Sequence, residues 1–212
     1  MAFVISLINQ KGGAGKTTNV ISLAGAFTKM GYNVAIVDSD TQGNMRDWKA
    51  VNEDNPIPVL GIDRPTIHND IKSLARFDIV LIDGAPTVEA MSASAIKASD
   101  LAIIPVQPSP LDIWATADLV DLVKTRIEIT DGKLQAAFLV SRVVANTTIG
   151  KEISDILAKY ELPVLDTAMS SLTDFSSCIK HGKTIIEYAP KSKAAELAMQ
   201  LANEIKTKYI DK

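Results

Sequence analysis

The feature of this chain that most constrains its fold is a glycine-rich decapeptide placed between an apolar run and a helical pattern. Residues 9–18 read NQKGGAGKTT, after the mostly apolar residues 3–8 and before a helical pattern that begins at residue 20. A strand, such a loop and a helix form the setting in which G-x-x-x-x-G-K-[ST] binds phosphates, because its backbone N–H groups can surround an anion. The decapeptide fits this pattern with Gln10 or Lys11 in place of the first glycine. It predicts a nucleotide-binding site.

Two side chains of this loop have specific expected roles. Lys16 would reach the β- and γ-phosphates of the nucleotide, and the Thr17 hydroxyl would ligate Mg²⁺. The alternative is a glycine-rich turn without a ligand, which the intact GKT sequence disfavours. The other residues expected to surround the phosphates are Gly12, Gly13, Ala14, Gly15 and Thr18.

A second lysine, Lys11, lies five residues before Lys16, and a phosphate loop that serves one nucleotide does not need it. The segment KGGAGKTT closely resembles the deviant Walker A box of the ParA/MinD family of ATPases. In that family the early lysine contacts the nucleotide held by the other subunit of a sandwich dimer. The resemblance therefore implies ATP or ADP as the ligand, an ATP-dependent homodimer and a catalytic role for Lys11. A solvated loop lysine is the alternative.

Strand and helix signals alternate along the whole chain. Short apolar runs at residues 33–38, 78–83, 101–106 and 136–140 predict strands buried on both faces, and residues 111–129 and 193–210 predict helices. This alternation predicts an α/β fold, a doubly wound, mostly parallel sheet with helices on both faces. The irregular residues 52–65 suggest an insertion or a weak edge strand.

No linker, repeat or low-complexity segment divides the chain, so a single domain over residues 1–212 is expected. The chain begins almost at its first strand. The resemblance is therefore closest to small ParA-like plasmid partition proteins, which lack an N-terminal DNA-binding domain.

Two acids follow the second predicted strand in the sequence DSDTQ, residues 38–42. This segment resembles the D-x-D-P-Q switch I of ParA proteins, with Thr41 where proline is usual. The resemblance implies that Asp38 holds a water on Mg²⁺ or positions Lys16, and that Asp40 orients the attacking water. Phosphoryl transfer needs mainly such positioning and charge neutralisation. A turn-initiating pair of acids at a strand end is the alternative.

A third acid, Asp83, ends the apolar strand 79–82 and has the form of a Walker B residue. An unpaired carboxylate after four aliphatic residues would be costly to bury, so an ion partner is expected. Coordination of Mg²⁺ through a water meets that need, and residues 84–86 then resemble switch II. The predicted metal residues are Thr17, Asp38 and Asp83.

Two further segments have less certain roles. Residues 105–112 contain three prolines before a predicted helix and resemble the proline-rich segment of small ParA-type proteins, where it takes part in dimer contacts; a rigid connector is the equal alternative. Arg142 follows a strand at the place where family members present residues to adenine. Ser141 stands where an asparagine is common in the family, which leaves the base contacts open.

The charge distribution bears on partners. The chain has a net charge of −3, yet residues 178–212 carry seven lysines against four acids. This basic end is either a solubilising face or an electrostatic footprint for phosphate backbones. The single cysteine, Cys178, excludes an internal disulfide, and no apolar run reaches the roughly 20 residues that a membrane span needs. The lysines expected to contact DNA are Lys180, Lys183, Lys191, Lys193, Lys206 and Lys208.

The resemblance implies a ParA-type ATPase that uses Mg²⁺, binds DNA without sequence preference and partitions plasmid or chromosomal DNA. A small centromere-binding adaptor, ParB-like or ParG-like, would stimulate hydrolysis, and the protein would be cytoplasmic and associated with the nucleoid. One alternative is a MinD-like protein, but the last predicted helix has a narrow apolar stripe and no membrane contact is expected. Another is a positioning ATPase for a protein organelle or for conjugation machinery. A metabolic kinase is disfavoured because nothing suggests an acceptor site.

Overall fold

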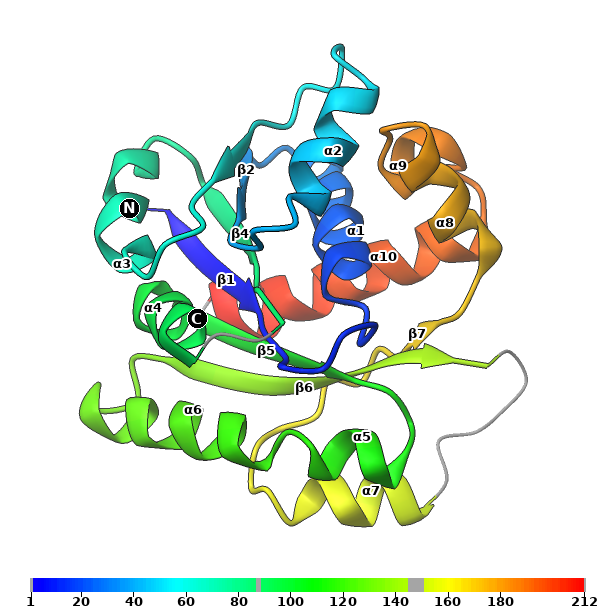
Figure 1. Ribbon diagram of the computed structural model, residues 1–212. Coiled ribbons are helices and arrows are strands. Elements are labelled where there is room, and N and C mark those ends of the chain that lie inside the picture. Colours follow the sequence, from blue (N-terminus) through cyan, green and yellow to red (C-terminus); the bar gives the residue numbers. More distant parts are fainter. Residues whose placement is uncertain (1, 87–88, 145–150, 212) are drawn as a thin grey trace.

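The centre of the molecule is one seven-stranded sheet (Figure 1). The computed structural model describes residues 2–86, 89–144 and 151–211. The strands lie in the order β3-β2-β4-β1-β5-β6-β7, and all the paired neighbours run parallel. They are β1 (Phe3–Leu7), β2 (Val34–Asp38), β3 (Val59–Gly61), β4 (Ile79–Asp83), β5 (Leu101–Val106), β6 (Gln135–Val143) and β7 (Met169–Ser170). The predicted doubly wound parallel sheet is confirmed.

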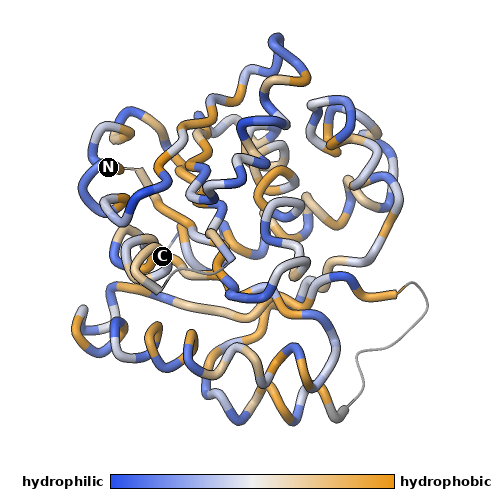
Figure 2. The backbone as a smooth tube through the Cα atoms, in the orientation of Figure 1, coloured by the Kyte–Doolittle hydropathy of each residue, from blue (hydrophilic) through white to orange (hydrophobic). Residues whose placement is uncertain are grey.

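Helices cover both faces of this sheet, and successive strand residues alternate between the two cores that result (Figure 1). In β4, Ile79 and Leu81 pack under one layer of helices, whereas Val80 and Ile82 pack under the other. Such strands must be apolar on both faces, which explains their continuous apolar runs, coloured as hydrophobic in Figure 2.

One helical layer contains α1 (Lys16–Lys29), α2 (Asn44–Val51), α8 (Thr173–Lys180), α9 (Ile185–Tyr188) and α10 (Lys193–Ile205). The other contains α3 (Ile67–Asp70), α4 (Glu89–Ala98), α6 (Ala117–Ile129) and α7 (Lys151–Ala158). Shorter elements are η1 (Ile71–Leu74), α5 (Pro110–Trp114) and the π-helical η2 (Lys206–Ile210). The helix predicted over residues 193–210 is therefore present as α10 and η2.

The helix predicted over residues 111–129 is interrupted in the structure. It is divided into α5 and α6, which begins at Ala117. At the break the backbone N–H of the buried Thr116 bonds to the carbonyl of Ile113, three residues earlier, at 3.0 Å, which is the bond of a turn and not of an α-helix. The irregular residues 52–65 contain β3, which lies at the edge of the sheet. Of the two alternatives, an insertion or a weak edge strand, the structure shows the edge strand.

Candidate nucleotide-binding site

The loop of residues 9–15 joins β1 to α1 where the strand order reverses, with β4 on one side of β1 and β5 on the other. Ligands of doubly wound sheets bind at such a point, beyond the carboxyl ends of the strands. Gly13 and Gly15 have φ values of +76° and +97°, in the left-handed region that favours glycine. Gly15 immediately precedes α1. The backbone N–H groups in the first turn of α1, which have no partner within the helix, therefore lie next to this loop.

A cavity of about 360 Å³ opens over the loop, and residues distant in sequence complete its walls. The predicted residues that line it are Gly12, Gly13, Gly15, Lys16, Thr17, Thr18, Asp40 and Arg142. Ala14 is buried, while Lys11, Asp38 and Asp83 contact the surrounding elements without lining the cavity. The structure therefore places eight of the twelve predicted residues in the wall of one cavity.

The Lys16 side chain is buried and folds back under the loop. Its ammonium donates to the carbonyl of Asn9 at 2.9 Å and to that of Lys11 at 3.3 Å. Burial lowers the pKa of Lys16, while the nearby carboxylates of Asp83 and Asp40 oppose this shift. A cation held by neutral carbonyls next to a line of N–H groups is suited to bind a phosphate.

Thr17 and Asp83 meet at the loop. The Thr17 hydroxyl donates to Oδ2 of Asp83 at 2.7 Å, and Oδ1 of Asp83 is buried with no hydrogen-bond partner among the described residues. Burial raises the pKa of Asp83 to about 7, with Asp38 and Asp40 adding to the rise and Thr17 and Lys16 opposing it. A bound cation would pair with this oxygen and stabilise the charged form of Asp83.

These donors fit Mg²⁺, which takes oxygen ligands and keeps several of its waters. No cluster of three or more Asp, Glu, His or Cys side chains that could hold a metal by itself occurs in residues 2–86, 89–144 and 151–211. The residues therefore suit a metal ion shared with nucleotide phosphates and water better than one held by protein alone.

Asp38 and Asp83 are neighbours, because β2 and β4 pair in a register that places these two residues opposite each other. Asp38 is fully buried, and Oδ1 accepts the backbone N–H of Asp40 at 3.1 Å. Its Oδ2 accepts the backbone N–H and the Nε–H of Arg46 at 3.2 and 3.3 Å. The ammonium of Lys16 bonds to the backbone carbonyls of Asn9 and Lys11, and no bond between Lys16 and Asp38 is seen among the described residues.

Lys11 does not line the cavity of its own chain and pairs with Asp112 of α5, Nζ to Oδ1 at 2.8 Å. Asp112 is largely buried, and apart from this ion pair the oxygen has no hydrogen-bond partner in the described part of the chain. The ammonium of Lys11 is therefore its only counter-charge at contact distance there.

The proline-rich segment 105–112 packs directly on the phosphate loop. The Asn9 amide donates to the carbonyl of Pro105 at 2.7 Å, and the Gln107 amide donates to that of Gly13 at 3.3 Å. Sequence reasoning missed Asn9, Gln107 and Asp112. Strands β1 and β5, which lead to these two segments, are paired neighbours in the sheet, and no pattern in the sequence indicates this pairing.

Arg142 has φ of +59°, and its Nη1 donates to the carbonyl of Gly13 at 2.8 Å. The predicted base-contact residue therefore lies at the cavity but is bonded to the loop. Beside it, Ser141 accepts the side-chain amide of Asn19 at 2.8 Å. Asn19 comes from α1, so β6 and α1 are tied together at this wall.

The wall formed by β7 and α8 was also missed by sequence reasoning. It includes the apolar side chains of Leu172, Phe175 and Ile179, which are suited to a flat heterocycle. Cys178 of α8 is buried, and burial raises the pKa of its thiol to about 11, which removes it as a thiolate nucleophile at neutral pH.

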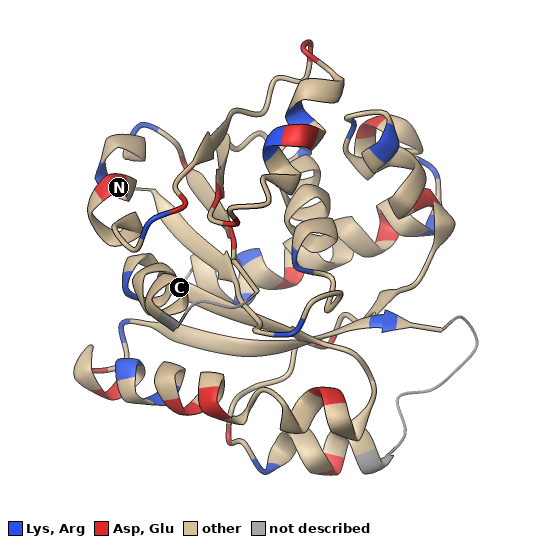
Figure 3. Cartoon of the chain, viewed as in Figure 1, with Lys and Arg blue, Asp and Glu red and all other residues tan. Residues whose placement is uncertain are grey.

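The C-terminal lysines fall into two groups. Lys193 pairs with Glu196, Lys206 with Asp211, and Lys208 with both Asp166 and Glu204. In contrast, three exposed lysines have no ion-pair partner within the described ranges. They are Lys180, Lys183 and Lys191. Figure 3 shows basic residues at the turn from α8 to α9 and acids at the ends of β2 and β4.

A doubly wound parallel sheet with a GKT loop at its switch point defines a P-loop nucleotide-binding protein. Residues 5–185 match the family described as the CobQ/CobB/MinD/ParA nucleotide binding domain, and the chain belongs to this family. The resemblance inferred from KGGAGKTT is confirmed. No helix in the described part of the chain is both long and apolar enough to cross a membrane.

Two curated relatives and one solved structure each align with at least 96% of the chain. It is 27% identical over 210 residues to the maintenance of carboxysome distribution protein A of Halothiobacillus neapolitanus, which covers 96% of both chains. It is also 27% identical over 254 residues to the sporulation initiation inhibitor protein Soj of Bacillus subtilis, with 97% of this chain and 98% of Soj covered. The septum site-determining protein MinD of Pyrococcus horikoshii, complexed with Mg-ADP, shares the fold, with a TM-score of 0.74, 22% identity and coverage of 97% and 96%.

Proposed function

We propose that this chain is a ParA-type ATPase that binds ATP with Mg²⁺, closes into a homodimer across two nucleotides and moves a cargo over DNA. The observation that carries the proposal is Lys11. It is a second lysine on the phosphate loop, and its ammonium lies outside the cavity of its own chain. A cation in that position is available to a nucleotide held by a second copy.

The proposed roles follow from the contacts of the site. Lys16 and the N–H groups of residues 12–18 hold the phosphates, and Thr17 with Asp83 holds Mg²⁺, which neutralises charge on the transferring phosphoryl group. Asp38 supports a metal-bound water from its place beside Asp83. Asp40, which lines the cavity, orients the attacking water.

DNA binding is assigned to the dimer. The isolated chain is acidic overall, with a net charge of −3, whereas Lys180, Lys183 and Lys191 are exposed without ion pairs among the described residues. A dimer doubles this set of free charges, and phosphate neutralisation grows with each contact. A small centromere-binding adaptor, ParB-like or ParG-like, then stimulates hydrolysis and releases the protein from the nucleoid.

The cargo has two candidates. The similarity to the chromosome-partitioning ATPase Soj of Thermus thermophilus supports partition of DNA, whereas the similarity to the carboxysome distribution protein supports positioning of a protein organelle. Deletion of the gene in its host distinguishes them. Loss of a plasmid or of chromosomes identifies partition, and a misplaced organelle with normal DNA inheritance identifies positioning.

The dimer is tested by Lys11→Ala with light scattering and an ATPase assay. We expect the variant to bind ATP, to stay monomeric, and to lose hydrolysis, since cations supplied in trans are worth roughly 10³–10⁵ in rate in related phosphoryl-transfer enzymes. Lys29→Ala, at the far end of α1, is the matched control and should dimerise normally. A normal ATP-dependent dimer with normal turnover in Lys11→Ala would refute the trans role.

A further inference from the structure

Arg46 attaches the N-terminal end of α2 to the carboxylate of Asp38 and to the backbone of Asp40. This side chain donates from Nε to Oδ2 of Asp38 at 3.3 Å and from Nη2 to the carbonyl of Asp40 at 2.8 Å. The backbone N–H of Arg46 also donates to Asp38, at 3.2 Å. One residue therefore joins the two predicted switch acids to the helix that follows them.

The path of the Arg46 side chain is closely bounded. A Cβ placed on Gly43 would lie 3.2 Å from Nε of Arg46, and one placed on Gly61 would lie 3.1 Å from its Cδ. Asp63 lies 3.6 Å from Nη1 on the third side. The planar guanidinium is thus held where it reaches the Asp38 carboxylate and the Asp40 backbone carbonyl together, which the single ammonium of a lysine reproduces only in part.

The other end of α2 is attached to the turn between α8 and α9. The Trp48 indole donates to the carbonyl of Lys183 at 3.3 Å, and the Asn55 amide donates to that of Gly182 at 2.9 Å. Gly182 has φ of +61°, and a Cβ there would lie 2.6 Å from Cβ of Asn52. The backbone of the turn therefore rests directly on the residues at the end of α2.

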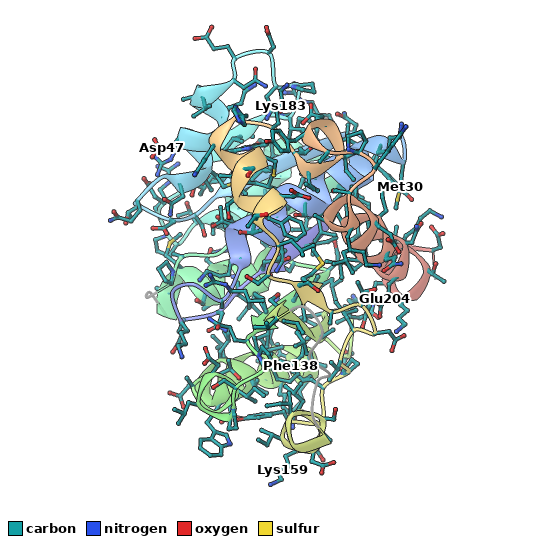
Figure 4. All side chains as sticks on the ribbon, turned by 90° about the vertical axis from the view of Figure 1, so that its right-hand side faces the viewer. Met30, Asp47, Phe138, Lys159, Lys183 and Glu204 are labelled. Carbon is teal, nitrogen blue, oxygen red and sulfur yellow. The ribbon has the colours of Figure 1, made fainter. Side chains whose placement is uncertain are left out.

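This turn carries two of the free lysines. Lys180 ends α8 and Lys183 follows Gly182, and Figure 4 shows Lys183 where α2 and the α8–α9 turn meet. Met45 and Trp48 are buried under α2, at 0% and 2% exposure. Closely packed side chains of this kind make a short helix move as a unit.

We propose that Arg46 is a positioning residue that ties Asp38 and Asp40 to α2, and that α2 thereby couples the nucleotide site to the turn bearing Lys180 and Lys183. The second half rests on the proposed DNA-binding function. When bound ATP and Mg²⁺ change the positions of Asp38 and Asp40, α2 shifts and changes the conformation of the α8–α9 turn. Since coupling is reciprocal, DNA on the turn alters nucleotide affinity by the same factor.

The coupling is tested without DNA by hydrogen exchange of the amides of residues 181–184, with and without a non-hydrolysable ATP analogue and Mg²⁺. We expect the analogue to change exchange at the turn in the wild type. That change should disappear in Arg46→Gln and return in part in Arg46→Lys. Arg64→Gln removes an exposed arginine whose partner is Asp70 and should behave as the wild type. A full response in an Arg46→Gln protein that binds the analogue would overturn the proposal.

The second experiment uses DNA and a variant at the other end of α2. Trp48→Phe removes the donor to Lys183 while keeping an aromatic ring in the core, and Tyr160→Phe is its control, since Tyr160 likewise donates to a backbone carbonyl. We expect the ratio of DNA affinities with ATP and ADP to fall about fivefold or more in Trp48→Phe, with ATP affinity and dimerisation retained.

The two proposals fail separately. If the wild type binds DNA equally with ATP and ADP, the proposed function is wrong, and the exchange experiment still decides whether α2 transmits nucleotide binding. If the wild type binds DNA more tightly with ATP than with ADP and Trp48→Phe leaves this ratio of affinities unchanged, the proposed coupling is wrong and the proposed DNA binding stands.

Discussion

Asp83 illustrates how burial and chemistry meet at a single residue. Its carboxylate is buried at the end of β4 with one oxygen unpartnered among the described residues, and burial raises its pKa to about 7. Because the unfolded pKa is near 3.8, the folded protein binds the proton more tightly between these values. Its stability without Mg²⁺ or nucleotide should therefore fall as pH rises from about 4 to 7 and level off above that range.

A shift of this size corresponds to a loss of roughly 4 kcal/mol at most, at about 1.4 kcal/mol per pKa unit. We expect Asp83→Asn to flatten this pH dependence, measured by urea unfolding of the ligand-free protein. Asp118→Asn, on the exposed face of α6, should leave the slope unchanged. A slope that survives in Asp83→Asn would assign the effect to another group.

Asp112 gives a second prediction at this scale. Its buried oxygen relies on Lys11, so moving Lys11 to a partner's nucleotide leaves this carboxylate uncompensated. We expect Asp112→Asn to favour the ATP-dependent dimer, seen as a lower dimer dissociation constant in sedimentation. The free energy of unfolding of the monomer should change by about 0.2–1 kcal/mol, since the Lys11 side of the ion pair is exposed to solvent. A weaker dimer in this variant would mean that Asp112 acts in the closed state.

At the scale of elements, the α8–α9 turn and the α10–η2 end carry lysines of different availability. Lys180 and Lys183 have no ion pairs among the described residues, whereas Lys206 and Lys208 are paired with acids. We expect Lys180→Ala/Lys183→Ala to abolish most ATP-dependent DNA binding in a filter assay. The double variant at Lys206 and Lys208 changes the net charge equally and should have a smaller effect. Equal losses would indicate that total charge matters and not the turn.

At the scale of the whole molecule, an acidic chain can bind DNA only through a localised basic surface. If the closed dimer engages about six phosphates, the logarithm of its affinity should fall against the logarithm of salt with a slope near −5. The slope should be seen with ATP and not with ADP, for duplexes of unrelated sequence. Strong preference for one sequence, or indifference to salt, contradicts nonspecific binding by a dimer.

Local patterns in the chain were sufficient to predict the sheet and the phosphate loop. Strands buried on both faces need continuous apolar runs, and a loop that approaches phosphates needs glycine at φ values such as those of Gly13 and Gly15. The break at Thr116 was missed because its backbone N–H bonds to the carbonyl three residues earlier, while the apolar periodicity of residues 111–129 continues across it. Such a bond leaves no periodic signal.

The sequence by itself determined the family, the sheet and the kind of ligand, because each depends on residues that lie close together along the chain. Only the tertiary structure decided that Lys11 pairs with Asp112, that half of the candidate lysines are neutralised by acids, and that α2 joins Asp38 to the α8–α9 turn. These contacts join residues far apart in sequence. Their geometry depends on how strands β1, β2 and β5 and the helices pack, which no local pattern specifies.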